Sequence, residues 1–216
     1  MKKVVKPVIV IMILVGVAAG AAVYFSRTAD KPAATASIPA NVDIKGGGHS
    51  RGPENAQVTL IEFGDYQCPT CGYYHPFVKE ILSRYPDKLR LEFHHFPIPS
   101  AHKNAVLAAM AAEAAGDQGH YWEMHDALYE NQRLWAENPN AEQYMIVLAS
   151  QLGLDVNKFM QGLRSPAIQD RILQDVARAN QLQINETPTF LIGGQRVYIK
   201  ASTEDFVQVI EAHLHK

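Results

Sequence analysis

The chain has 216 residues, of which 47% are hydrophobic, so it is long and apolar enough to bury a sizeable core. Its formal net charge is −2, and this balance does not indicate a nucleic-acid partner. The chain contains only two cysteines, which excludes a small domain held together by several disulfide bonds.

The N-terminal segment, residues 1–27, is first basic and then apolar. Three lysines precede residues 7–26, which carry no charged side chain. Twenty helical residues span about 30 Å, the thickness of the hydrocarbon core of a bilayer. By the positive-inside rule, we expect a single-pass membrane anchor with its N-terminus inside and the rest of the chain on the extracytoplasmic side. The alternative is a signal peptide cleaved at an A-x-A site, residues 19–21, which would secrete the same domain.

The segment after the apolar run, residues 28–55, is rich in Ala, Pro, Ser, Thr and Gly. Such a composition buries little apolar surface and predicts a flexible linker. We therefore expect one folded domain, residues 56–216, connected by this linker to the N-terminal segment.

The folded domain begins with a strand, a helix and a second strand. Residues 58–63 (VTLIEF) and 89–96 (LRLEFHHF) are short apolar runs typical of buried strands. Between them, apolar residues recur at helical spacing. We expect this helix to begin at or just after Cys68, with Pro69 in its first turn, and to end before Pro86. This order predicts a β-α-β unit with parallel strands.

The long middle of the chain is predicted to be helical and the end to return to the sheet. The helices are expected at residues 101–115, 120–131, 141–152, 155–163 and 166–182. Two strands around Gly193-Gly194 form a hairpin, and a final helix follows a capping box at Ser202 and Asp205. The fold class is thus α/β, β-α-β then β-β-α, with a helical insertion at about residues 100–185. The insertion is expected to shape a substrate groove, to which four side chains could contribute, but their helical spacing favours a place in its core: Trp122, Met124, Tyr129 and Trp135.

The two cysteines, Cys68 and Cys71, lie in the segment FGDYQCPTCGYY, and their C-x-x-C spacing fits three kinds of site. A structural disulfide between them would close a tiny loop and stabilise the fold little. A metal site would need two more ligands, for which His75, His94 and His95 are candidates. Adjacent strand residues point to opposite faces, so we expect one of His94 and His95 in the core and the other in solvent. All three histidines are interpreted as structural, and no metal is assigned.

The third possibility, a redox-active Cys68–Cys71 disulfide, accounts for the residues around it. A thiol at a helix N-terminus faces free N–H groups and the positive end of the helix dipole, which both favour the thiolate. The pKa of such cysteines falls to about 3.5–7.5. We expect Cys68 to be the nucleophile, and Cys71, one turn further, to be the buried thiol that resolves mixed disulfides. Pro69 and Thr70 support this centre.

Two further features could serve such a centre. Glu62 is a carboxylate on an apolar strand, six residues before Cys68. It either faces solvent or acts as a buried proton acceptor for Cys71. Thr187-Pro188 opens a strand, where proline is otherwise unfavourable. A cis bond there would present the Thr187 backbone to a substrate peptide.

Three stretches together resemble the DsbA-type branch of the thioredoxin superfamily. They are FGDYQCPTC, HHFPIPSAHKNAVLAAMAAEAAGDQGHYWEMHDALYENQ and NETPTFLIGGQRV. The resemblance covers residues 52–215 and implies a thioredoxin fold with an inserted helical domain. It further implies that Cys68 is the exposed nucleophile, that Cys71 is its buried partner, and that Pro188 is cis. Glu62 stands where this family has its buried acid.

The chain departs from the resemblance between its cysteines. DsbA of enteric bacteria carries Pro-His there, whereas this chain has Pro69-Thr70. A histidine adds charge stabilisation to the thiolate, and Thr70 can offer only a hydroxyl group. Because thiolate stabilisation favours the reduced form, we expect an oxidising pair that is a weaker oxidant than the Pro-His type.

The predicted function is an extracytoplasmic thiol–disulfide oxidoreductase that forms disulfides in exported proteins by exchange at Cys68 and Cys71. No metal or organic cofactor is expected, because the dithiol itself carries the electrons. The resemblance implies a membrane quinone-coupled thiol oxidase as redox partner, and we expect a monomer. One alternative is a disulfide reductase or isomerase of the same fold. Another is a metal-binding or metal-delivery module that uses the cysteine pair.

Overall fold

The computed structural model describes residues 47–215, and the predicted membrane anchor at residues 7–26 lies outside them. No helix in the described part of the chain is long and apolar enough to cross a membrane.

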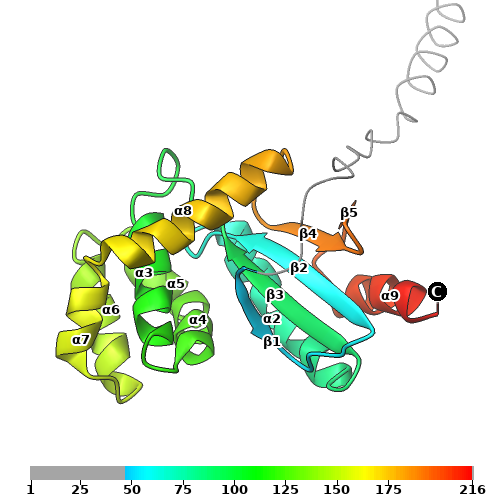
Figure 1. Ribbon diagram of the computed structural model, residues 1–216, viewed down its shortest axis with the longest axis horizontal. Helices are drawn as coiled ribbons and strands as arrows, with labels where there is room; N and C mark the ends of the chain where they lie inside the picture. Colours follow the sequence, from blue (N-terminus) through cyan, green and yellow to red (C-terminus); the bar gives the residue numbers. More distant parts are fainter. Residues whose placement is uncertain (1–46, 216) are drawn as a thin grey trace, which may run out of the picture. The chain divides into compact units, whose positions relative to one another are not determined.

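The described residues form five strands and eight helices, shown in Figure 1. In chain order they are β1 (His49–Arg51), β2 (Val58–Gly64), α2 (Pro69–Arg84), β3 (Leu89–His95), α3 (Ala105–Gly116), α4 (Tyr121–Glu130), α5 (Gln132–Trp135), α6 (Ala141–Gln151), α7 (Val156–Gly162), α8 (Pro166–Gln181), β4 (Thr189–Ile192), β5 (Gln195–Val197) and α9 (Thr203–Leu214).

One sheet joins the two halves of the fold, with the strand order β1-β3-β2-β4-β5. β2 and β3 are parallel and are connected through α2, whereas β4 and β5 form an antiparallel hairpin. β4 returns after the helical insertion to pair antiparallel with β2. The predicted β-α-β unit, hairpin and thioredoxin-type order are therefore confirmed.

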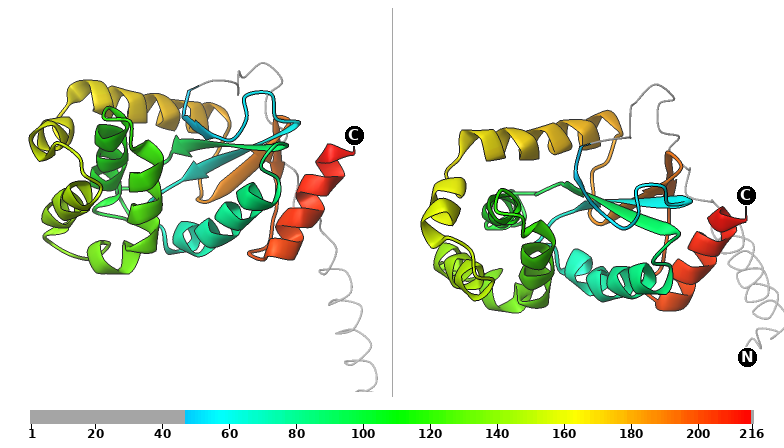
Figure 2. Two further views of the ribbon diagram at one scale, coloured as in Figure 1. Left: turned by 90° about the horizontal axis from the view of Figure 1, so that it is seen from below. Right: turned by 60° about the horizontal axis from the view of Figure 1, so that its bottom comes forward.

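Helices cover both faces of this sheet, as the two views of Figure 2 show. α2 and α9 lie on one face, where Leu60, Leu91 and Phe190 pack against Ile81 and Phe206. α8 lies on the other face. The residues between this helix and the sheet form a smaller apolar cluster: Ile61, Phe63, Phe96, Ala179, Leu182, Ile184 and Leu191. Because strand side chains alternate between faces, residues two apart on β2 share a face. Glu62 and Leu60 thus point toward α2.

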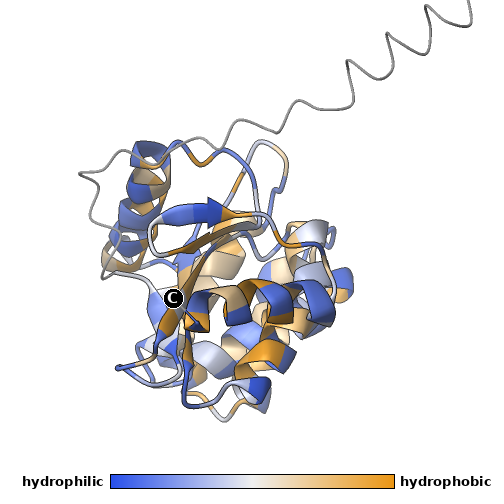
Figure 3. Cartoon of the chain, turned by 90° about the vertical axis from the view of Figure 1, so that its right-hand side faces the viewer, coloured by the Kyte–Doolittle hydropathy of each residue, from blue (hydrophilic) through white to orange (hydrophobic). Residues whose placement is uncertain are grey.

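The inserted helices α3–α7 have a core of their own beside the sheet. α3 is almost entirely buried and alanine-rich, which lets its neighbours approach closely. Trp135, Met124 and Leu128 fill the space around it. In Figure 3 hydrophobic and hydrophilic residues occur together on the helices, as expected for helices that pack on a core and also meet solvent. This core also includes the two cysteines.

Most helix boundaries follow the local signals in the sequence. Asp155 and Ser165 cap α7 and α8, and Ser202 accepts a hydrogen bond from the Asp205 backbone N–H at the start of α9. α3 begins at Ala105, four residues later than predicted. The preceding residues instead form a turn, in which the His102 backbone N–H donates to the Ile98 carbonyl at 2.8 Å.

The linker prediction is wrong at its C-terminal end, because residues 49–51 form β1 and pair antiparallel with β3. This strand has no buried apolar run that its sequence could reveal. Polar contacts hold it instead. The Trp122 indole N–H donates to the Ser50 carbonyl at 2.9 Å, and Arg51 donates to both carboxylate oxygens of Asp126 at 3.2–3.3 Å. The folded domain therefore includes residues that we expected in the linker.

Arg51 is expected to stabilise the packing of β1 against the rest of the domain. Its guanidinium lies 4.6 Å from the centre of the Trp122 ring in addition to binding Asp126. Arg51→Ala should lower the free energy of unfolding by about 1–2 kcal/mol in urea denaturation, since both contacts are partly exposed. Arg90→Ala on β3 is the control, because the described residues give Arg90 no ion pair. Equal losses in the two variants would contradict this role for Arg51.

Candidate active site

Cys68 and Cys71 lie at the start of α2, as predicted. Cys68 is the N-cap residue, with extended backbone angles (φ −64°, ψ 120°), and Pro69 occupies the first helical position. No side chain caps this helix end, so its N–H groups stay available to the Cys68 sulfur. Cys68 is 7% exposed and Cys71 is fully buried at 0%. Both are free thiols in the structure.

The two thiols are driven toward opposite protonation states. The pKa of Cys68 falls to about 5, mainly through a hydrogen bond from the Cys71 thiol. Burial opposes this fall, while the Thr187 side chain and the backbone N–H groups of Cys71 and Thr70 add to it. Burial raises the pKa of Cys71 well above its usual value, and its hydrogen bond to Cys68 raises it further. At neutral pH the pair therefore consists of one thiolate and one thiol.

The Thr187-Pro188 segment is distant from the cysteines in sequence but lies next to Cys68 in the structure. Its peptide bond is cis, as the resemblance implied. The Thr187 carbonyl oxygen lies 3.5 Å from Cys68 Sγ, so it can accept a hydrogen bond when Cys68 is protonated. A groove of about 520 Å³ runs along this segment and is also lined by Thr70 and Tyr74.

A second groove of about 540 Å³ borders the other side of the N-terminus of α2. It lies between α2 and the α4–α5 segment and includes Pro69, Tyr73 and Leu134 among its lining residues. Tyr73 and Leu134 are 62% and 58% exposed, so this groove has large apolar side chains on its surface. The active-site helix therefore starts between two grooves.

Glu62 is buried, which excludes the solvent-facing interpretation of its position. It is 3% exposed and points from β2 toward the face covered by α2. Burial raises the pKa of its carboxyl group to about 8. Its charge also contributes to the raised pKa of Cys71, which places the two groups close enough to influence each other. The carboxyl group is consequently protonated at neutral pH.

Sequence reasoning missed three residues that hold the loop before Cys68. Asp65 is buried and accepts hydrogen bonds from the Gln67 and Ile98 backbone N–H groups at 2.8 and 2.9 Å. Gln67 donates to the Ala136 carbonyl at 2.6 Å. Gln132 donates to the carbonyls of Tyr66 and Cys68 at 2.7 and 2.8 Å. The short polar run GDYQ between a buried strand and the cysteines was the available signal.

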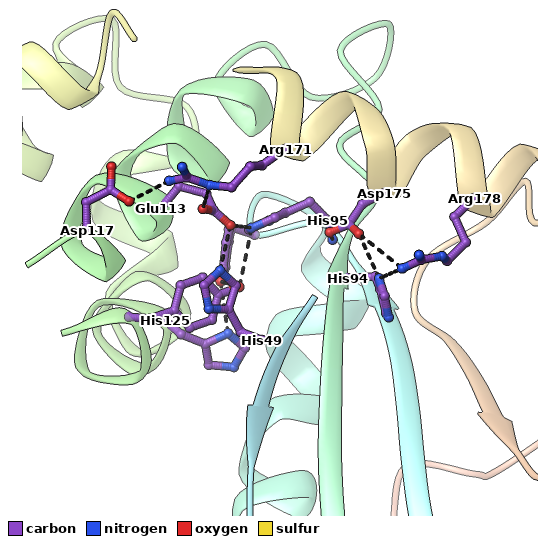
Figure 4. Close-up of polar contacts among 11 residues, drawn as sticks. His49, His94, His95, Glu113, Asp117, His125, Arg171, Asp175 and Arg178 are labelled. Atoms are coloured by element: carbon purple, nitrogen blue, oxygen red, sulfur yellow. Dashed lines mark hydrogen bonds and ion pairs between the residues drawn. The ribbon is translucent and has the colours of Figure 1, made fainter. Parts of the chain in front are cut away.

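The expectation for His94 and His95 is wrong, because both are buried. His94 points to the α8 face and forms hydrogen-bonded pairs with Asp175 at 2.7 Å and Glu92 at 2.9 Å. These pairs outweigh burial and raise the pKa of His94. His95 points to the opposite face and contacts Glu113 at 3.1 Å (Figure 4). Adjacent strand residues do face opposite ways, but here helices cover both faces.

Two groups of side chains in residues 47–215 could each approach a single cation, and neither contains a cysteine. The first is His49, His95 and Glu113, and the second is His75, His125 and Asp126. In the first, Arg171 already binds the second oxygen of Glu113 at 2.6 Å, as Figure 4 shows. The histidines that we considered as ligands thus pair with carboxylates instead of converging on the cysteines.

Comparison with known proteins identifies the family. A family model described as thioredoxin matches residues 45–212. The chain belongs to the thioredoxin family. BdbD from Bacillus subtilis superimposes with a TM-score of 0.69 at 21% identity, covering 77% of this chain and 92% of that chain. A thioredoxin-like oxidoreductase from Silicibacter pomeroyi DSS-3 gives 0.66 at 27% identity, covering 78% and 92%.

A third solved structure, alpha-DsbA1 from Wolbachia pipientis, has a TM-score of 0.66 at 23% identity and covers 77% of this chain and 90% of that one. These likenesses confirm the predicted thioredoxin fold and the resemblance to DsbA-type proteins. The enzyme class expected from the sequence, a DsbA-type thiol–disulfide oxidoreductase, is the class of these structural neighbours.

Curated relatives match over one part of their length. A Na(+)/H(+) antiporter NhaA 1 from Salinispora arenicola is 40% identical over 148 residues, which are 68% of this chain. An antiporter NhaA from Herminiimonas arsenicoxydans is 33% identical over 186 residues. The chain spans 22% and 28% of the lengths of these two antiporters.

The low pKa of Cys68 should depend on Cys71 more than on the Thr70 side chain. Cys71→Ala removes the largest contribution to the thiolate, so the pH midpoint of Cys68 alkylation by iodoacetamide should move upward from about 5. Thr70→Ala keeps the backbone N–H groups and should leave this midpoint unchanged. An unmoved midpoint in C71A, or equal shifts in both variants, would contradict this assignment.

Glu62 should make stability depend on pH. Its pKa is raised from 4.5 to about 8, so the folded chain keeps a proton that the unfolded chain releases in this window. As pH rises from 4.5 to about 8, the free energy of unfolding of the wild type therefore falls relative to that of Glu62→Gln, by about 1.4 kcal/mol per pH unit at most. Urea unfolding at pH 5 and pH 8 measures the difference, with exposed Glu54→Gln as control. A constant difference between E62Q and wild type would refute the raised pKa.

Proposed function

We propose that this protein is an extracytoplasmic dithiol oxidase that forms disulfides in exported proteins by exchange at Cys68 and Cys71. The observation that carries the proposal is the pairing of a stabilised thiolate with a buried thiol one helical turn away. A stabilised thiolate makes Cys68 a good leaving group and favours the reduced form of the pair, so the disulfide form withdraws electrons from substrates.

The reaction begins when a substrate thiolate attacks the Cys68 sulfur of the Cys68–Cys71 disulfide. The bond between the two enzyme sulfurs breaks, and Cys71 leaves as a thiolate that takes a proton from the Glu62 carboxyl group. A second substrate thiolate then attacks the substrate sulfur of the mixed disulfide, and Cys68 leaves as a thiolate. Two electrons pass from the substrate dithiol to the enzyme. Glu62 suits its role because its pKa of about 8 lies below that of Cys71.

The substrate chain is proposed to bind beside Thr187 and Pro188, in the groove that runs along them. The Thr187 carbonyl already reaches Cys68, so an extended peptide bonded to that segment would bring its own cysteine to the nucleophile. Pro69 and Thr70 border the two grooves and support this approach. The enzyme is proposed to work as a monomer, because Cys68, Cys71, Glu62 and Thr187 all come from one chain.

The setting of the reaction is also part of the proposal. Residues 7–26 would hold the domain on the extracytoplasmic side of the membrane, or a signal peptide would release it there. Exported proteins that carry thiols would be the substrates. A membrane quinone-coupled thiol oxidase would regenerate the Cys68–Cys71 disulfide, and the dithiol needs no further cofactor.

The reduction potential tests the direction of electron flow. A pKa near 5 for Cys68 lies between the values of about 7 for thioredoxin and about 3.5 for DsbA. We therefore expect a potential between about −270 mV and about −120 mV in glutathione buffers. Thr70→His should move it upward by about 30 mV for each 1.4 kcal/mol of added thiolate stabilisation.

The alternatives have distinct outcomes in the same experiment. A potential as low as that of thioredoxin would overturn the oxidase and favour a reductase. Cys68→Ser must abolish exchange with glutathione, and persistent exchange in that variant would refute the mechanism. Thr203→His on α9, away from the cysteines, is the control for adding a histidine and should leave the potential unchanged.

A further inference from the structure

Tyr129 is a buried residue whose hydroxyl group has no partner. Its side chain extends from α4 and the residue is 5% exposed. Among residues 47–215, three buried side-chain nitrogen or oxygen atoms lack a hydrogen-bond partner, and Tyr129 Oη is one of them. A buried polar group without a partner destabilises the fold. Such a group is therefore a candidate for a functional role.

The hydroxyl group and the Phe93 ring share the space that Gly64 leaves open at the end of β2. A Cβ atom at Gly64 would collide with the Phe93 ring and would lie 3.0 Å from Tyr129 Oη. Gly64 is two residues beyond Glu62 on the same strand, so both face the α2 side of the sheet. The absence of a side chain at Gly64 thus lets the Phe93 ring and the tyrosine hydroxyl both reach the face of the sheet that carries the buried acid.

The other side of Tyr129 packs on the active-site helix. Its ring lies 4.9 Å from the His75 ring, centre to centre. His75 follows Cys71 by four residues on α2, so the two share one face of the helix. Tyr129 therefore lies between the strand that carries Glu62 and the helix face that carries Cys71. The charges of Cys71 and Glu62 are, after burial, the largest influences that raise the pKa of Tyr129.

Several titratable groups surround this hydroxyl. Besides Cys71 and His75 from α2 and Glu62 from β2, Tyr66 contributes from the loop before Cys68, with its ring 4.9 Å away. His125 contributes from α4, with its ring 5.2 Å away. The Tyr66 hydroxyl group donates a hydrogen bond to the Tyr121 hydroxyl group and also forms one with His125 Nδ1. It therefore already has partners, unlike the Tyr129 hydroxyl group.

We propose that Tyr129 is a catalytic hydrogen-bond donor for the Cys71 thiolate, a charge that exists only while disulfides are exchanged. In the step proposed above, the substrate thiolate forms a bond to Cys68, the Cys68–Cys71 bond breaks, and the electron pair stays on the Cys71 sulfur. The Tyr129 O–H donates to that sulfur until the proton of Glu62 neutralises it. A free donor close to the place where charge develops stabilises the transition state. This inference rests on the proposed thiol–disulfide exchange.

Tyr129→Phe in the full chain separates this role from packing. The probe is reduced glutathione, which attacks oxidised Cys68 without the binding of a polypeptide, and stopped-flow fluorescence gives the rate. We expect about a tenfold lower rate, the size of a hydrogen bond to a charged group. The glutathione equilibrium at pH 7 and the pH profile of Cys68 alkylation should not change, because Cys71 is neutral in both end states. The reduced variant should be as stable as wild type or more so in urea.

Tyr144→Phe is the matched control, because its hydroxyl group on α6 donates to Asn131 at 3.2 Å, away from the cysteines. This variant should keep the wild-type rate. A Y129F rate within twofold of wild type would overturn the proposal. So would a loss of rate accompanied by a matching loss of stability or by a changed alkylation profile, since either indicates packing.

A double variant identifies the group on which the tyrosine acts. In the Glu62→Gln background, Y129F should still slow the reaction, because the Cys71 thiolate remains. Loss of the effect there would overturn the assignment to Cys71 and transfer it to Glu62. If the oxidised wild-type chain does not react with glutathione at all, thiol–disulfide exchange itself fails, and this outcome is distinct from a normal wild type with an unaffected Y129F.

Discussion

Two sulfur atoms one helical turn apart have to differ in protonation, and the rest of the site is arranged around this difference. Cys68 lies where the helix has free N–H groups, and no Ser, Asp or Asn side chain competes for them. Cys71 lies one turn deeper, beyond the reach of solvent. The Cys71 thiol and the helix N–H groups therefore stabilise a charge on the Cys68 sulfur, and burial disfavours a charge on the Cys71 sulfur. A conventional N-cap at position 68 would satisfy the helix and remove the reactive thiolate.

The helical insertion contributes to the site as well as covering it. Gln132 holds the carbonyls of Tyr66 and Cys68, and the Ala136 carbonyl holds Gln67. Tyr129 and the rings around it close the space behind Cys71. The loop before Cys68 thus takes its shape from side chains of α5 and its surroundings. Displacing the insertion would release the loop, and the nucleophile would lose its fixed place relative to Thr187.

The parts of the fold that depend on local pattern could be predicted from the sequence. Apolar runs marked β2, β3 and β4, and Pro69 with Cys68 marked the start of α2. β1 could not be found in this way, because it is an edge strand held by its backbone and by Arg51. The burial of both His94 and His95 depends on α8 and α3 covering opposite faces of the sheet, which strand alternation alone cannot show.

The residues of the site also fall into those with a local sequence signal and those without one. The cysteines, Glu62 and Thr187-Pro188 carry short-range signals, namely a motif, a charge in an apolar strand and a proline at a strand start. Asp65 and Gln132 act through partners distant in sequence, and helical spacing placed Tyr129 only in a core. What a buried side chain faces is decided by tertiary packing, and a single sequence does not encode it in any local pattern.

The long separation between Cys68 and Thr187, 119 residues, has a consequence for biosynthesis. A chain emerging from the ribosome, N-terminus first, exposes its cysteines well before β4 and the Thr187 segment have been synthesised. During that interval the central strand β2 lacks one neighbour, and Cys68 lacks the carbonyl it contacts in the finished fold. The complete site, with β4 paired to β2 and the Thr187 carbonyl beside Cys68, therefore forms only when almost all of the polypeptide has been delivered.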